Sequence, residues 1–203
     1  SGVSVEEGYT YRWEHSHQEV VDAALEAINT LLSGRNLTLT FLVENQWWPG
    51  FTFTMPALTR CLLDGIQYEN KGIMLDTGHL MNANLELRTQ EEGADWVSRM
   101  LEEHGGLGSM VRGIHLHQSL SGAYVKAHTG SLPDPWPVDY AEQFCQSYQH
   151  ILSIDTHRPW TTPAVRALVE RIAPEWLVHE LSAANRAERD KRLEIQSRAL
   201  GVL

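Results

Sequence analysis

Hydrophobic and polar positions along the chain follow two periods in turn, and these periods predict alternating helices and strands. Apolar residues recur at helical spacing over residues 17–32, and a Ser-Gly pair follows as a stop signal. The run LTLTFLVE at 37–44 is apolar almost throughout, which is typical of a strand covered on both faces in a parallel sheet. The same patterns predict further helices at about 56–67, 89–104 and 138–152, from 163 and from 182, and strands at 72–76, 111–117 and 175–180.

The four predicted strands are each separated by a helix-sized interval, which indicates repeated βα units and an α/β fold with a parallel sheet. Polar residues stand at the carboxyl end of every strand: Glu44, Asp76, the pair His115 and His117, and Glu180. Barrel enzymes carry their chemistry at these ends. No strand is followed by a glycine-rich phosphate turn. The sequence therefore favours a (β/α)8 TIM barrel over a doubly wound sheet.

The length of the chain conflicts with a complete barrel. A barrel of eight strands needs about 250 residues, whereas this chain has 203 and shows only about four βα units. We treat residues 1–203 as a single domain. Four open strands would leave two unpaired edges. We therefore expect the missing half from another chain, from a second copy in a homo-oligomer, or from a removed amino-terminal segment.

Composition narrows the possible functions. Hydrophobic residues make up 42% of the chain and charged residues 21%, which excludes a disordered polypeptide. The formal charge of −10, without any basic run, argues against nucleic-acid binding. The apolar stretches are too short to span a membrane, and the polar start does not resemble a signal peptide, so we expect a soluble, cytoplasmic protein. Cys61 and Cys145 lie in apolar helical patterns, so we expect buried, reduced thiols.

The residues at the strand ends form a chemically coherent set. Alternate side chains of a strand share a face, so His115 and His117 point the same way, whereas His179 points away from the face that carries Glu180. Two glutamates, an aspartate and a histidine converging in this way make a mixed nitrogen and oxygen site for a divalent metal ion. Buried charges are costly unless they are paired or metal-bound.

These residues lie in motifs that resemble the xylose-isomerase-like barrels, a family that includes sugar phosphate isomerases and epimerases and apurinic endonucleases. The resemblance rests on VEN at 43–45, LDTGHLMN at 75–82, IHLHQS at 114–119 and VHE at 178–180. In the family pattern these motifs belong to the last four strands. The chain would therefore correspond to the carboxyl-terminal part of such a barrel.

The resemblance implies one divalent metal ion, with Mn²⁺ favoured over Co²⁺, Mg²⁺ or Zn²⁺, held by Glu44, Asp76, His115 and Glu180. The two glutamates would also be the catalytic acid and base. The implied activity is that of an isomerase, an epimerase or a related lyase that transfers a proton next to the carbonyl of a sugar or sugar phosphate.

Further side chains are expected to contact the substrate. An indole ring offers a flat face to a sugar, an arginine can anchor a phosphate or carboxylate, and the histidines and the aspartate can hydrogen-bond hydroxyl groups. The candidates are His79, His117, Trp47, Asp155, His157 and Arg158. The long connection at 118–137 is expected to serve as a lid.

Two alternatives stay open. An endonuclease IV-like zinc phosphodiesterase acting on abasic DNA would need a cluster of three metal ions, including ligands from a D-x-H element. His128 could supply one ligand, but Lys126 stands where the acidic ligand is expected. Asp155 and His157 form a D-x-H later in the chain, although its place before a helix fits that role poorly. The other alternative is a non-catalytic half-barrel that serves as an assembly subunit.

Overall fold

A computed structural model describes residues 3–35 and 37–203 and shows a mixed α/β fold around one parallel sheet. Its four strands lie in the order β1-β2-β3-β4, which is also their order in the sequence. They are β1 (Phe41–Glu44), β2 (Lys71–Asp76), β3 (Val111–Leu116) and β4 (Trp176–His179). The α/β class and the four parallel strands are thereby confirmed. Over the described residues the sheet is open, with β1 and β4 at its edges, so the closed barrel stays a prediction.

The helices follow the predicted alternation, with three short α-helices and one 3-10 helix added. They are α1 (Val5–Thr10), α2 (His17–Leu32), α3 (Pro56–Gly65), α4 (Thr77–Asn82), α5 (Gln90–His104), α6 (Gly122–His128), α7 (Tyr140–Ile154), α8 (Ala164–Ile172), α9 (Arg186–Leu200) and the 3-10 helix η1 (Gly105–Met110). Capping boxes at Ser16 and Thr89 fix the starts of α2 and α5. The short helices α1, α4 and α6 were not predicted. Among the described helices, none has both the length and the apolar character that a membrane span requires.

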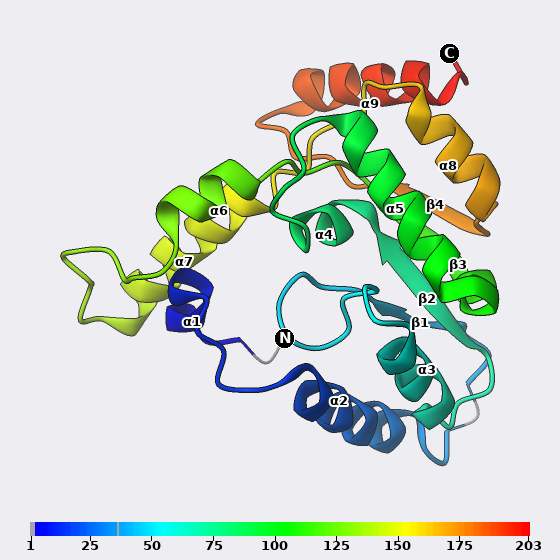
Figure 1. Ribbon diagram of the computed structural model, residues 1–203, viewed down its shortest axis with the longest axis horizontal. Helices are drawn as coiled ribbons and strands as arrows, with labels where there is room; N and C mark the ends of the chain where they lie inside the picture. The colour runs from blue at the N-terminus through cyan, green and yellow to red at the C-terminus, as the bar shows by residue number, and fades with distance from the viewer. Residues whose placement is uncertain (1–2, 36) are drawn as a thin grey trace.

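The helices cover one face of the sheet. Figure 1 shows α2, α3, α5, α8 and α9 in an arc around its outer side. Ile73, Leu75, Ile114 and Leu116 point into this layer and are fully buried. The opposite face is partly open. There Leu42 and Met74 lie over Gly113 of β3, while Trp176 and Val178 of β4 are 42% and 43% exposed.

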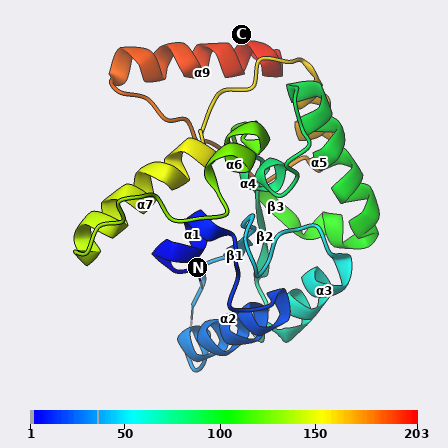
Figure 2. The same ribbon diagram turned by 60° about the vertical axis from the view of Figure 1, so that its left-hand side comes forward.

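A second group of helices lies beyond the carboxyl ends of the strands. Figures 1 and 2 both place α1 beside α7. The Tyr9 hydroxyl donates to the Gln146 carbonyl at 3.0 Å, and the Ser147 hydroxyl donates to the Val5 carbonyl at 3.1 Å. The connection predicted as a lid contains α6 and is tied to α1 by Gly130, whose N–H donates to the Tyr9 carbonyl.

Two sequence predictions differ from the structure. The strand predicted at 37–44 begins only at Phe41, because side chains take up the preceding backbone groups: the Tyr68 hydroxyl donates to the Leu37 and Leu39 carbonyls. The prediction of buried thiols is wrong, since Cys61 and Cys145 are both exposed. Their helices bury a different face, so an apolar helical pattern did not locate these side chains.

Candidate metal centre

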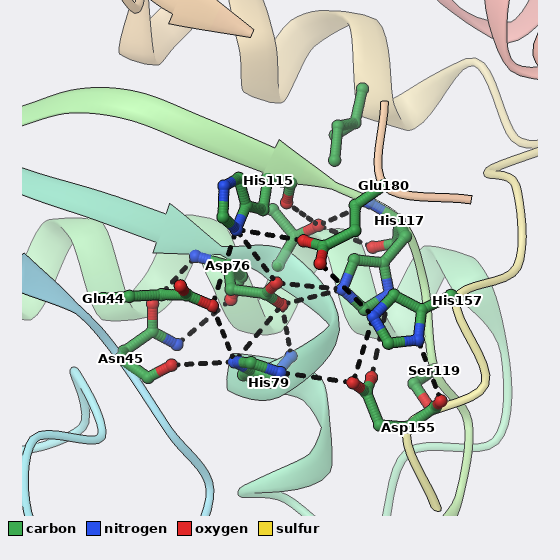
Figure 3. Close-up of polar contacts among 12 residues, drawn as sticks. Glu44, Asn45, Asp76, His79, His115, His117, Ser119, Asp155, His157 and Glu180 are labelled. Carbon is green, nitrogen blue, oxygen red and sulfur yellow. Dashed lines mark hydrogen bonds and ion pairs between the residues drawn. The ribbon is translucent and has the colours of Figure 1, made fainter. Parts of the chain in front are cut away.

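Three carboxylates from the carboxyl ends of β1, β2 and β4 meet around the imidazole of His115, which lies near the end of β3 (Figure 3). The Nδ1 atom of His115 lies 2.9 Å from Oε2 of Glu180, 3.4 Å from Oε1 of Glu44 and 3.7 Å from Oδ2 of Asp76. The strand register explains why these side chains meet. Asp76 and His115 are paired residues on the neighbouring strands β2 and β3, and Glu44 and Glu180 stand at the carboxyl ends of the edge strands β1 and β4. The predicted ligand set is thus brought together in space.

The arrangement of these atoms fits a divalent cation. Ligand atoms of Glu44, Asp76 and His115 all lie within 4.8 Å of one another. Within the described part of the chain, Nδ1 of His115 and Oε2 of Glu180 are buried, and their close approach to each other, at 2.9 Å, needs a proton or a cation between the two atoms. Buried polar atoms without partners are costly. A cation between them would satisfy both atoms, and carboxylates with an imidazole suit Mn²⁺, Co²⁺ or Zn²⁺.

The pKa shifts in the cluster also indicate that a positive charge is favoured between its carboxylates. Contact with Glu180, and then with Glu44, raises the pKa of His115 to about 10. The contact with His115 in turn lowers the pKa of Glu180 far below its ordinary value. Several carboxylates converge here, and either a proton or a metal ion can balance their charge.

Asp76 is both the end of β2 and the N-cap of α4, because the strand runs into the helix without a loop. Its Oδ1 atom accepts the backbone N–H of His79 at 2.7 Å, which gives the D-x-x-H spacing its physical basis. Asn45, the residue directly after β1, holds the same junction between β2 and α4. Its side-chain amide donates to the Asp76 carbonyl at 3.0 Å and accepts the Asp76 N–H at 2.8 Å. The Asn45 carbonyl contacts Nδ1 of His79 at 2.8 Å.

A second group of polar side chains adjoins the first. Asp155 and His157 follow α7, and the paired backbones of Gln118 and Arg158 hold this segment beside the end of β3. Oδ2 of Asp155 lies 3.2 Å from Nε2 of His79 and 3.2 Å from Nε2 of His157. From the position of this D-x-H element before a helix we expected a poor fit, but the segment lies beside the site all the same.

The second group also has the composition of a cation site. Ligand atoms of His117, His157 and Glu180 lie within 4.8 Å of one another. Burial opposes protonation of His79, but its hydrogen bond to Asp155 and the charge of Asp76 raise its pKa to about 9. The pKa of His157 is also raised against the effect of burial, by Glu180 and Asp155.

The three other predicted substrate contacts, His117, Arg158 and Trp47, differ from one another in how they lie relative to the cluster. His117 is fully buried, with Nε2 about 3.0 Å from Oδ2 of Asp76, so in this arrangement a substrate does not reach it. Arg158 is exposed in a groove that Lys191 and Arg192 of α9 also line, and it does not join the cluster. The ring of Trp47 lies 4.9 Å from that of His79 and forms a wall beside the cluster.

Asn45 ends the VEN motif and carried no predicted role, although it links this motif to the one that contains Asp76. Its only signal was its place directly after Glu44 at a strand end. A scan against protein-family models finds no match for this chain, and a search of curated proteins finds none either.

Proposed function

We propose that the protein is a divalent-metal-dependent isomerase or epimerase, or a related lyase, that acts on a sugar or sugar phosphate. The observation that supports this is the convergence of Glu44, Asp76, His115 and Glu180 around one small space, with two buried polar atoms that need a proton or a cation between them. These four residues would hold the metal ion, with Mn²⁺ as the favoured ion. When bound, the ion would polarise the carbonyl and hydroxyl oxygens of the substrate.

The two glutamates supply the acid and base of the proposed reaction. They stand at the carboxyl ends of β1 and β4, the two edge strands of the sheet, and both lie within 3.4 Å of His115, so they border the space from two sides. Glu180, like an ordinary glutamate, is ionised at neutral pH, and the adjacent His115 lowers its pKa further. It can accept a proton from the carbon next to a carbonyl, while a protonated Glu44 would deliver its own proton from the other side, so that the two carboxyl groups exchange protonation states in each turnover. Both side chains are about one-third exposed, which leaves them open to a substrate.

The surrounding residues would orient the substrate. His79 is held by Asn45 and Asp155 beside the proposed ligands, and Trp47 offers an aromatic face next to it. Aromatic faces suit the C–H face of a sugar ring, and histidines suit its hydroxyl groups.

We also propose that the open sheet is one half of a (β/α)8 barrel that another half closes. The sequential order of parallel strands, the helices on one face only and the half-exposed Trp176 and Val178 on the other support this arrangement. If a second copy closes the sheet, analytical ultracentrifugation will give a dimer. A stable monomer with a complete metal site would contradict closure by a second copy.

A second candidate function follows from the contacts of Asp155. Its carboxylate lies between His79 and His157, and both distances are 3.2 Å. A D-x-H element placed in this way resembles the extra metal ligands of the endonuclease branch, and it favours a zinc phosphodiesterase with several metal ions. The formal charge of −10 weighs against a DNA substrate.

Elemental analysis after loading with Mn²⁺ or Zn²⁺ and desalting separates these candidates. One ion per chain, lost in Glu44→Gln and Glu180→Gln but retained in the exposed control Glu26→Gln, supports the isomerase. Several zinc ions with cleavage of an abasic duplex support the phosphodiesterase. A folded protein that retains neither ion overturns both and favours a non-catalytic assembly subunit.

The reaction itself is tested by proton NMR in D₂O with a panel of aldoses, ketoses and their phosphates. We expect deuterium to replace the hydrogen next to the carbonyl in the wild-type and Glu26→Gln proteins. Folded Glu44→Gln and Glu180→Gln variants should lose this exchange. Full exchange in both variants would refute the proposed mechanism.

A further inference from the structure

Gly78 lies in the first turn of α4, between the proposed ligand Asp76 and His79. A Cβ atom built at this glycine would overlap the imidazole ring of His117. Of its three nearest atoms, all in this ring, the farthest is Nε2, at only 2.8 Å. Real Cβ atoms essentially never approach another atom so closely. The side chain of His117 therefore occupies the space that any other residue at position 78 would need.

The ring of His117 has no free direction in which to move. The ring of His157 stacks on it with centroids 4.3 Å apart and an interplanar angle of 18°. The backbone is fixed as well, because the Trp160 indole N–H donates to the His117 carbonyl at 2.9 Å. The residue is completely buried. A side chain added at position 78 would thus displace the ring from its contact with Asp76.

That contact orients Asp76. Nε2 of His117 lies 2.9 Å from Oδ1 and 3.0 Å from Oδ2 of the carboxylate, so its N–H can donate to Asp76. Groups that hydrogen-bond to a metal ligand fix its orientation, and their loss typically lowers metal affinity by about 10- to 100-fold. Nδ1 of His117 has no hydrogen-bond partner among the described residues, which leaves Nε2 as the nitrogen that serves Asp76.

We propose that Gly78 and His117 form a size-matched pair that positions Asp76 for metal binding. The missing side chain at position 78 lets the imidazole of His117 reach the carboxylate from beneath α4. His117 is thus a positioning residue and not a substrate contact. This inference rests on the proposed function, because it takes Asp76 as a metal ligand.

The pair is tested with a double-mutant cycle of Gly78→Ala, His117→Ala and the double variant. The dissociation constant for Mn²⁺ is measured by competition with a fluorescent chelator, and Tm is measured by circular dichroism in EDTA. Gly8→Ala in α1 is the control, because a Cβ there would make only an ordinary contact of 3.6 Å.

Each single variant is expected to bind Mn²⁺ at least tenfold more weakly than the wild type. The double variant should bind no more weakly than His117→Ala, and its Tm should not fall below that of His117→Ala, because removing the ring makes room for the new methyl group. His117→Gln, which retains an N–H donor, should bind more tightly than His117→Ala. Gly8→Ala should leave the affinity unchanged.

The proposal would be overturned if the losses of affinity in the two single variants multiply in the double variant. It would also be overturned if Gly78→Ala binds Mn²⁺ like the wild type. If Gly78→Ala does not fold, folding of the double variant supports the pair, whereas a double variant that fails where His117→Ala folds refutes it. If the wild type binds no Mn²⁺, the proposed function fails, but the Tm values alone still decide whether the two positions are coupled.

Discussion

Replacing Asn45 with alanine should strongly destabilise the metal-free protein. The Asn45 side chain is fully buried and makes two hydrogen bonds to the backbone of Asp76, at 2.8 and 3.0 Å. In the Asn45→Ala variant the Asp76 N–H and carbonyl would remain buried at the junction of β2 and α4 without these partners.

The magnitude follows from those two backbone groups. Each buried polar group left without a partner costs about 1–3 kcal/mol, so the free energy of unfolding should fall by about 2–6 kcal/mol. For a protein of this size, 1 kcal/mol shifts Tm by about 2–4 °C, so the expected decrease in Tm is on the order of 10 °C.

Thermal and urea unfolding followed by circular dichroism in EDTA would measure the effect without a contribution from bound metal. Asn84→Ala is the matched control, because the side chain of Asn84 makes one hydrogen bond, in which it accepts the N–H of the exposed Glu86 at 3.1 Å. A loss below about 1 kcal/mol in Asn45→Ala, or an equal loss in the control, would refute the reasoning, since the first figure is the lower limit for even one orphaned group.

Three further predictions concern charge and metal binding. Burial opposes ionisation of Glu7, but backbone N–H groups of Glu14 and Ser4 donate to its carboxylate and lower its pKa. Stability from a lowered pKa exists above the unfolded value of about 4.3 and is lost as pH falls through the folded one. Glu7→Gln should therefore lower Tm at pH 7, and the difference in Tm between variant and wild type should shrink as the pH falls below about 4.3. Asp155→Asn removes the partner that counteracts the effect of burial on His79, so the pKa of His79 should fall from about 9 towards or below 6.5 in a histidine-resolved NMR titration of the metal-free protein; an unchanged value would contradict the assigned cause. Mn²⁺ at 100 times its dissociation constant should stabilise the fold by about 2.7 kcal/mol, and excess EDTA should reverse the rise in Tm; no rise at saturating Mn²⁺ would show that the ion does not prefer the folded state.

The sequence was informative where periodicity and strand ends determine the structure. Glu44, Asp76 and His115 meet because parallel strands end at one edge, and hydrophobic patterns place those ends within a residue or two. The two long helices with capping boxes, α2 and α5, begin where the sequence indicates.

Other features depend on contacts that periodicity does not encode. The six-residue α4 is too short to show a helical repeat, and its N-cap is a strand residue. The burial of His117 depends on the missing side chain of Gly78, which lies on another element. The exposure of Cys145 depends on which face of α7 packs against α1, and both faces of that helix carry apolar residues.

The direct passage of β2 into α4 has a consequence for the thermodynamics of ion uptake. Because the fold itself holds the Asp76 carboxylate with the N–H of His79 and with His117, its ordering entropy is lost during folding and not when the ion arrives. Sites that fold around their ion bury apolar surface as they bind and show a negative heat-capacity change. Calorimetry of Mn²⁺ binding to this protein should instead give a heat-capacity change close to zero, with an association rate limited by dehydration of the ion.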